Sequence, residues 1–206
     1  HPKVKVKLQV GNRAEVTSAL AVQEVDLAVM GRPPSELRAN ATAFARHPMA
    51  FVAAPSHPVM QLPAPTLADL NEHSLLVRER GSGTRSTIEA LFREAGVELA
   101  IGAELSSNEA IKQMCAAGFG VAFLSMHACV LELQAGLLAQ VPVAGQPIER
   151  DWYVISLAGR AMPAAAAAFE AFLREQGAAL IEQRRYQPAP PAEPPAKKGK
   201  PARRSG

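Results

Sequence analysis

The sequence is poor in cysteine and in aromatic residues, and it has no long apolar run. Only two of its 206 residues are cysteines, Cys115 and Cys129, and neither belongs to a CxxC pair. This spacing argues against a disulfide framework and against a zinc site. No run of about 18 apolar residues is present, which argues against a membrane-spanning helix. The first residues lack the apolar segment of a signal peptide, so we expect a cytoplasmic protein without a membrane partner.

The motifs of common enzyme classes are missing as well. Gly81-Ser82-Gly83 has Arg80 at the position nearest to the first glycine of a G-x-S-x-G nucleophile elbow, and there is no G-x-x-x-x-G-K-[ST] phosphate loop. The acidic residues are scattered and predict no pair of catalytic carboxylates. Four histidines do not have the spacing of metal ligands, so we expect them in surface or packing roles; they are His47, His57, His73 and His127. We therefore expect no enzyme, no cofactor and no metal site.

Positive charge is concentrated at one end of the chain. The formal net charge is +3, but residues 187–206 alone contribute +4, which leaves −1 for the rest. This segment is rich in proline and alanine and has no periodic apolar residues, so we expect a disordered tail. A weak contact with DNA or another polyanion is the alternative role for it. The folded body is not expected to present a basic surface to nucleic acid.

The first part of the chain indicates a β-α-β unit. Alternating apolar residues predict a strand with one buried face over 4–10. A helix over 13–23 and a buried strand over 26–30 follow, and this order predicts that the two strands are parallel. The next strand falls within 44–54.

A second α/β series follows the proline-rich connector at 63–65. Thr66 with Asp69, and Ser106 with Glu109, have the spacing of helix capping boxes. The series then consists of a strand over 74–77, a helix with apolar positions Ile88, Leu91, Phe92 and Ala95, a strand over 97–104, a helix ended by Gly118, and strands over 121–124, 138–143 and 152–157. Pro163 opens a last helix, whose residues Phe169, Phe172 and Leu173 we expect to face inward.

The segment Arg78–Arg85 (RERGSGTR) joins a predicted strand to a predicted helix. Its two glycines allow a tight turn, and the N–H groups of a helix start point outward without partners. Hydroxyls from Ser82 and Thr84 and positive charge from Arg80 and Arg85 complete a setting that favours an anion. No nucleophile with a neighbouring base is present, so the segment indicates binding rather than catalysis.

Seven segments, taken in their order, resemble the effector-binding domain of a LysR-type transcriptional regulator. They are Asn12, Asp26–Met30 (DLAVM), Ser56–Pro58 (SHP), Thr66–Leu70 (TLADL), Arg78–Arg85, Ser107–Lys112 (SNEAIK) and Ala117–Ser125 (AGFGVAFLS). The resemblance covers about residues 4–179. The last three segments are most similar to regulators of the Calvin-cycle (RuBisCO) operon.

The resemblance implies an α/β fold of the two-lobed, type 2 periplasmic-binding-protein-like kind, with a small-molecule site between the lobes. The chain should cross between lobes near 51–58 and return near 152–157. Lobe I would comprise 1–55 with 153–180, and lobe II would comprise 56–152. The family's first strand and helix have no counterpart here, so the domain is expected to be N-terminally truncated, with an incomplete ligand site and an exposed strand edge. The family's helix-turn-helix domain and linker helix likewise have no counterpart in these 206 residues, so we expect no binding to an operator by this segment alone.

The candidate effector contacts are residues that the resemblance and the helix starts place at the interlobe site. They are Asn12, Arg13, Arg80, Gly81, Ser82, Gly83, Thr84, Arg85, Asn108 and Ser125. Purely structural roles are the alternative for these residues. The hydroxyls of Ser82 and Thr84 would also suit helix caps, and the two arginines would also suit pairing with Glu79 or Glu89.

The function implied is that of an effector-sensing domain that responds to a small anionic metabolite. A phosphorylated sugar or a nicotinamide nucleotide would suit the finer resemblance. The partners implied are a homo-oligomer and, only through the absent helix-turn-helix domain, DNA. A solute-binding protein of a transport system, which shares the architecture, is the alternative.

Overall fold

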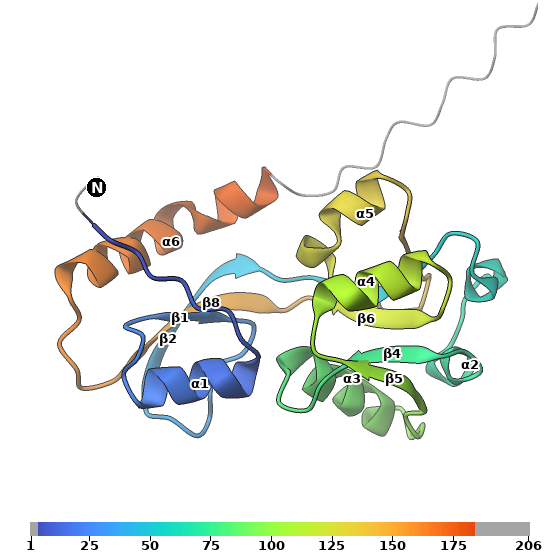
Figure 1. Ribbon diagram of the computed structural model, residues 1–206, viewed down its shortest axis with the longest axis horizontal. Coiled ribbons are helices and arrows are strands. Elements are labelled where there is room, and N and C mark those ends of the chain that lie inside the picture. The colour runs from blue at the N-terminus through green and yellow to red at the C-terminus, as the bar shows by residue number, and fades with distance from the viewer. Residues whose placement is uncertain (1–3, 184–206) are drawn as a thin grey trace, which may run out of the picture.

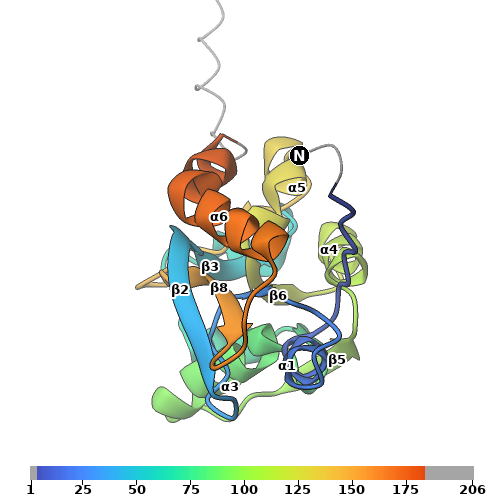
Figure 2. The same cartoon turned by 90° about the vertical axis from the view of Figure 1, so that its left-hand side faces the viewer.

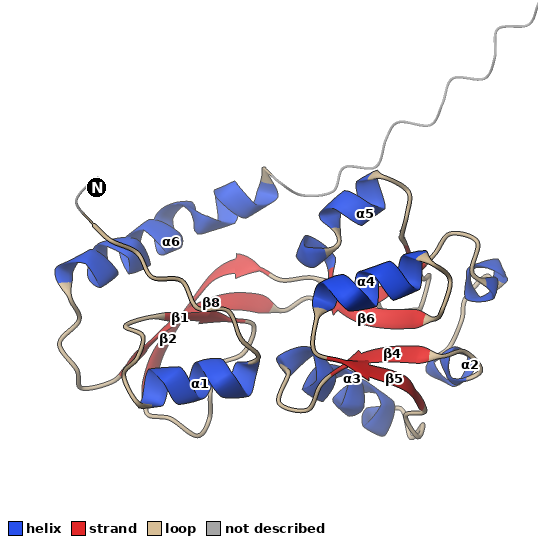
Figure 3. Ribbon diagram, in the orientation of Figure 1, coloured by secondary structure: helices blue, strands red, loops and turns tan. Residues whose placement is uncertain are grey.

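The computed structural model describes residues 4–183, so the tail predicted at 187–206 lies outside the described residues. These residues form two α/β lobes that lie side by side, connected by two chain segments in the middle of the molecule (Figure 1). Strands lie inside each lobe and helices lie around them (Figure 3). Between residues 4 and 183, no helix is long and apolar enough to cross a membrane.

Lobe I is built on a three-stranded antiparallel sheet, with the strand order β1-β8-β2. These strands are β1 (Ala28–Met30), β8 (Asp151–Leu157) and β2 (Ala39–Arg46). The helix α1 (Arg13–Ala21) packs on β1 and β8, and α6 (Ala164–Glu182) packs on β2. Gly177 of α6 lies so close to the ring of Phe44 that any side chain there would collide with it.

Lobe II is built on a five-stranded mixed sheet, with the order β5-β4-β6-β3-β7. Its strands are β3 (Met49–Ala53), β4 (Leu75–Arg78), β5 (Ile101–Leu105), β6 (Val121–Ser125) and β7 (Ala139–Gln140). The pairs of β4 with β5 and of β4 with β6 are parallel, whereas β3 is antiparallel to both of its neighbours. Parallel pairs require crossover helices, which the chain supplies as α3 (Gly83–Glu94) and α4 (Asn108–Ala116).

The sheet of lobe II has a hydrophobic core on each face. Phe51 of β3 packs with Phe92 of α3 on one face, and Val52 joins Ile111 of α4 on the other. The alternation of β3 side chains therefore supplies both cores. The remaining helical segments of this lobe are η1 (Pro58–Gln61), α2 (Leu67–Asn71), η2 (Met126–Ala128) and α5 (Val130–Gln134).

The chain passes between the sheets at two neighbouring points. The first lies between β2 and β3, at His47 and Pro48, and the second lies just before β8, where His47 and Arg150 exchange two backbone hydrogen bonds. The strand β3 therefore belongs to the sheet of lobe II, and the crossing predicted near 51–58 is placed too late. The reason is that the segment 44–54, expected to hold one strand, contains the end of β2 and all of β3, which only His47 and Pro48 separate.

The predicted strand over 4–10 is wrong. These residues form an exposed segment without regular structure that leads into α1 (Figure 2), and the side chains of Val6, Leu8 and Val10 are 84%, 83% and 88% exposed. A strand needs a neighbouring strand for its hydrogen bonds, and within residues 4–183 none lies beside this segment. The parallel β-α-β pairing predicted for it is therefore also not formed.

Other local predictions have mixed outcomes. The capping box of Thr66 and Asp69 is confirmed at the start of α2. The second capping box is not formed, because Ser107 rather than Ser106 caps α4 and Glu109 pairs with Lys112 instead. Phe169 and Phe172 do not face inward but stay 50% and 39% exposed, because α6 meets the sheet mainly through other positions around Gly177.

Candidate functional site

The turn between β4 and α3 presents an uncapped helix start. Gly81 has a φ of 90°, which favours glycine, and the N–H of Ser82 donates to the carbonyl oxygen of Glu79 at 3.2 Å. Ser82 occupies the N-cap position, but its hydroxyl makes no capping hydrogen bond. The N–H groups of Gly83, Thr84 and Arg85 consequently have no hydrogen-bond partner within residues 4–183. This helix start can accept an anion.

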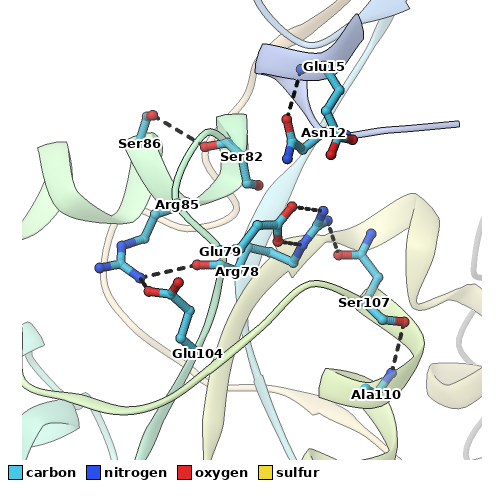
Figure 4. Close-up of polar contacts among 11 residues, drawn as sticks. Asn12, Glu15, Arg78, Glu79, Ser82, Arg85, Ser86, Glu104, Ser107 and Ala110 are labelled. Atoms are coloured by element: carbon cyan, nitrogen blue, oxygen red, sulfur yellow. Dashed lines mark hydrogen bonds and ion pairs between the residues drawn. The ribbon is translucent and has the colours of Figure 1, made fainter.

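The start of α1, from the other lobe, touches this turn. Asn12 caps α1 through a complete capping box with Glu15, and the N–H of Ala14 donates to the carbonyl oxygen of Gly81 at 3.2 Å. A Cβ atom on Gly81 would lie only 3.2 Å from the Cβ of Ala14, so glycine also allows this close approach. Two helix starts from different lobes therefore meet at one point (Figure 4).

An ion-pair network lies beneath this contact. The guanidinium of Arg78 donates to both carboxylate oxygens of Glu79, at 2.7 and 2.9 Å, and to the side-chain oxygen of Asn108 at 2.7 Å (Figure 4). These bonds to Arg78 are the main reason why the pKa of Glu79 is lowered, and Asn12 lowers it further. Arg78 thus connects Glu79, in the turn before α3, to Asn108 at the start of α4. It was not among the predicted contacts.

The predicted arginines differ in their surroundings. Arg85 is buried, and its guanidinium pairs with Glu89 at 2.6 Å and with Glu104 at 3.0 Å. Arg13 pairs with Glu36 at 3.1 Å, and its stem would contact a side chain at Gly83. Arg80 is exposed and has no charged partner within the described part of the chain.

Ser125 lies apart from the turn, at the end of β6 opposite Met49. Its hydroxyl is buried and has no hydrogen-bond partner in residues 4–183. The structure thus brings Asn12 to Gly81 and Arg13 to Gly83, and it connects Asn108 through Arg78 to Glu79 in the same turn. Thr84 belongs to the same helix start.

A second arginine that sequence reasoning missed lies at the crossover between the lobes. The guanidinium of Arg150 donates to the hydroxyl oxygen of Thr87 on α3. That hydroxyl in turn donates to the carbonyl oxygen of Gly83 at 2.8 Å. Because 63 residues separate Arg150 from Thr87, no local pattern could have indicated this contact.

The structure gives no sign of nucleophilic or metal chemistry among residues 4–183. Burial raises the pKa of both thiols, Cys115 and Cys129, to about 12, so they stay protonated. No group of three metal-ligating side chains occurs in the described ranges. A small pocket lies in lobe I, between α1 and the start of α6, and is lined by Leu20, Val25, Asp26, Ser156, Leu157, Arg160, Ala161, Met162 and Pro163.

Curated relatives of this chain are bacterial transcriptional regulators. It is 39% identical over 181 residues to the HTH-type transcriptional regulator CbbR of Sinorhizobium medicae, covering 87% of this chain and 58% of the relative. It is 36% identical over 180 residues to the RuBisCO operon transcriptional regulator of Allochromatium vinosum, covering 87% and 60%. The chain therefore spans less than two thirds of the length of these relatives.

Solved structures show the same architecture. The regulatory domain of Synechocystis CcmR in complex with 2-PG has a TM-score of 0.80 at 33% identity, covering 85% of this chain and 84% of that one. Reduced OxyR of Neisseria meningitidis has a TM-score of 0.67 at 21% identity, covering 84% and 82%, which supports the fold alone. The sequence pattern of the LysR substrate binding domain matches residues 1–178. The chain belongs to the LysR substrate-binding domain family and has its two-lobed, type 2 periplasmic-binding-protein-like fold.

Proposed function

We propose that this chain is the effector-sensing part of a transcriptional regulator of Calvin-cycle (RuBisCO) operon genes, and that a small anionic metabolite binds where its lobes meet. The observation that carries the proposal is the contact of two helix starts from different lobes, at Ala14 and Gly81. The start of α3 favours an anion because its N–H groups are free and because of the helix dipole. The 2-PG complex of the CcmR regulatory domain supports this choice of ligand.

Binding at this contact would change how the lobes are held together. An anion that uses the free N–H groups of Gly83 and Thr84 lies beside the bond between Ala14 and Gly81, so it alters the interlobe contact directly. A ligand shifts the equilibrium between two arrangements of the lobes only if it binds one arrangement more tightly than the other. Residues from both lobes form this site, so its geometry, and with it the affinity, changes when the lobes move. In a homo-oligomer, that change would reach DNA-binding domains elsewhere in the regulator. We propose sensing in the cytoplasm rather than catalysis.

Calorimetric titration of the intact gene product tests the site. The ligands are 2-PG, a phosphorylated sugar and a nicotinamide nucleotide. At least one should bind, and Arg80→Ala should weaken it about tenfold, because Arg80 is an exposed cation with no charged partner among residues 4–183. Arg93→Ala, at the opposite end of α3, is the matched control and should leave affinity unchanged. Absence of binding by all three ligands would reject the proposal.

The regulatory step has its own test. A mobility-shift titration with the promoter of a RuBisCO operon should give a complex whose affinity or footprint changes on addition of the ligand that binds. A complex that the ligand does not affect would separate ligand binding from control of DNA and would reject that part of the proposal.

A further inference from the structure

The crossover between the lobes holds a cation that faces lobe II. His47 and Arg150 lie directly opposite each other and exchange backbone hydrogen bonds of 2.7 and 3.3 Å, so their side chains lie on the same face of this ribbon. From this position Arg150 reaches Thr87, and Thr87 reaches the carbonyl oxygen of Gly83. The guanidinium therefore lies about one helical turn along α3 from the uncapped helix start.

Arg150 lacks the carboxylate partner that the neighbouring arginines have. Within residues 4–183, no acidic side chain pairs with it. By contrast, Arg13 pairs with Glu36, and Arg78 pairs with Glu79. Arg85 pairs with both Glu89 and Glu104. Burial, and then the positive charge of Arg32, lower the pKa of Arg150, whereas Tyr153 raises it. A partly buried guanidinium beside a second cation is unfavourable without an anion, since desolvation and repulsion act in the same direction.

His47 provides a second observation at the same place. Its ring is buried with both nitrogens lacking a hydrogen-bond partner within the described residues, while its face stacks on Trp152 at 3.8 Å between ring centroids. Burial, with smaller contributions from His127 and Arg150, lowers its pKa to about 3, so the ring is neutral at physiological pH. A neutral imidazole still offers one donor and one acceptor, and buried polar atoms of this kind normally have partners.

We propose that Arg150, with Arg32 and His47 beside it, binds a second anionic group of the effector. This inference rests on the proposed function, and it adds that the effector carries two anionic groups. The first group lies at the N–H groups of Gly83 and Thr84, and the second lies at Arg150. One helical turn separates the two positions, so the groups are on the order of 5 Å apart. Arg150 then selects ligands with two such groups over ligands with one.

The test measures the binding of 2-PG and of inorganic phosphate to the intact gene product by calorimetry. The fluorescence of Trp152, which is the one tryptophan of residues 1–206, gives a second readout. The variant Arg150→Gln can keep a hydrogen bond to Thr87 but removes the charge. It should weaken 2-PG binding by about 10- to 100-fold, as expected for a lost hydrogen bond to a charged group. Arg150→Lys should recover part of this loss. Arg93→Gln, on the exposed surface of α3, is the charge-matched control and should bind like the wild type.

A structural role for Arg150 predicts different results. Because the unliganded protein holds Arg150 without a carboxylate, Arg150→Gln should leave the melting temperature unchanged or raise it. An unchanged affinity for 2-PG, or an equal loss for 2-PG and inorganic phosphate, would overturn the inference while the proposed function stands. A wild-type protein that binds neither 2-PG nor any other anionic metabolite would instead overturn the proposed function.

Discussion

The two lobes differ in how completely their sheets are covered and paired. In lobe II both faces of the five-stranded sheet carry a core, one that includes Phe51 and one that includes Val52. In lobe I the buried core cluster of the described residues contains only Leu20, Ala28, Met30 and Ile155, and the segment 4–10 pairs with no strand within residues 4–183. Because stability follows buried apolar area, lobe II should be the more robust half of the molecule. The helix starts that form the candidate site come from both halves.

Matched core substitutions give the largest test of this difference. Leu75→Ala in lobe II and Leu20→Ala in lobe I remove the same atoms from side chains that are 0% and 1% exposed. We expect a loss of about 4 kcal/mol for Leu75→Ala and about 2 to 3 kcal/mol for Leu20→Ala, because the smaller cluster can collapse around the cavity. Urea denaturation of the 206-residue chain measures both free energies of unfolding. An equal or larger loss for Leu20→Ala would show that the cores are equally rigid.

The junction between the lobes should contribute strongly to the pH dependence of the free energy of unfolding. The pKa of His47 is lowered to about 3, chiefly by burial, from the 6.5 expected in the unfolded chain. As the pH falls, His47 therefore takes up a proton in the unfolded state before it does so in the folded state. The contribution of neutral His47 to the free energy of unfolding is complete above about pH 6.5 and is lost as the pH falls toward about pH 3. His47→Phe keeps a ring against Trp152 and removes this effect, on the order of 3 kcal/mol between about pH 7 and about pH 4.

Denaturation at a series of pH values measures this effect. His73→Phe is the control, because His73 also contacts another ring, that of His57, but sits in lobe II away from the crossover. The control should change the slope between about pH 7 and about pH 4 much less than His47→Phe does, because His73 is the smallest of the causes that lower the pKa of His57 and of Asp69. A His47→Phe slope that equals the wild-type slope would place the titrating groups elsewhere.

Local features of lobe II could be predicted from the sequence, and tertiary contacts could not. The spacing from Ile88 to Ala95 and the box of Thr66 and Asp69 identify α3 and α2, since both patterns are complete within one helical segment. Arg85 meets Glu104 only because β5 lies beside β4, and 19 residues separate the two side chains. The candidate residues at the two helix starts could be named from the sequence. Which arginines have a carboxylate partner could not, because it depends on which strands and helices lie side by side.

Lobe I shows the limit of periodicity more clearly. The alternation over 4–10 indicates which face of a strand would be apolar, but it says nothing about whether a neighbouring strand exists. In the same way, the apolar pattern of α6 predicts a buried stripe at Phe169 and Phe172, although the sheet of lobe I meets the helix near Gly177 instead. The sequence pattern describes one element, whereas burial depends on two.

The smallest expected effect therefore comes from the segment 4–10. The double substitution Val6→Ser with Leu8→Ser should change the free energy of unfolding of the 206-residue chain by less than about 0.5 kcal/mol, because both side chains are more than 80% exposed. Val154→Ser, at a position on β8 that is 1% exposed, is the buried control and should cost about 2 kcal/mol or more. Urea denaturation at two protein concentrations measures both. A loss above about 1 kcal/mol for the double variant that grows with concentration would mean that another copy of the chain covers Val6 and Leu8. A loss independent of concentration would mean that they pack within the chain, and lobe I would then be as fully covered as lobe II.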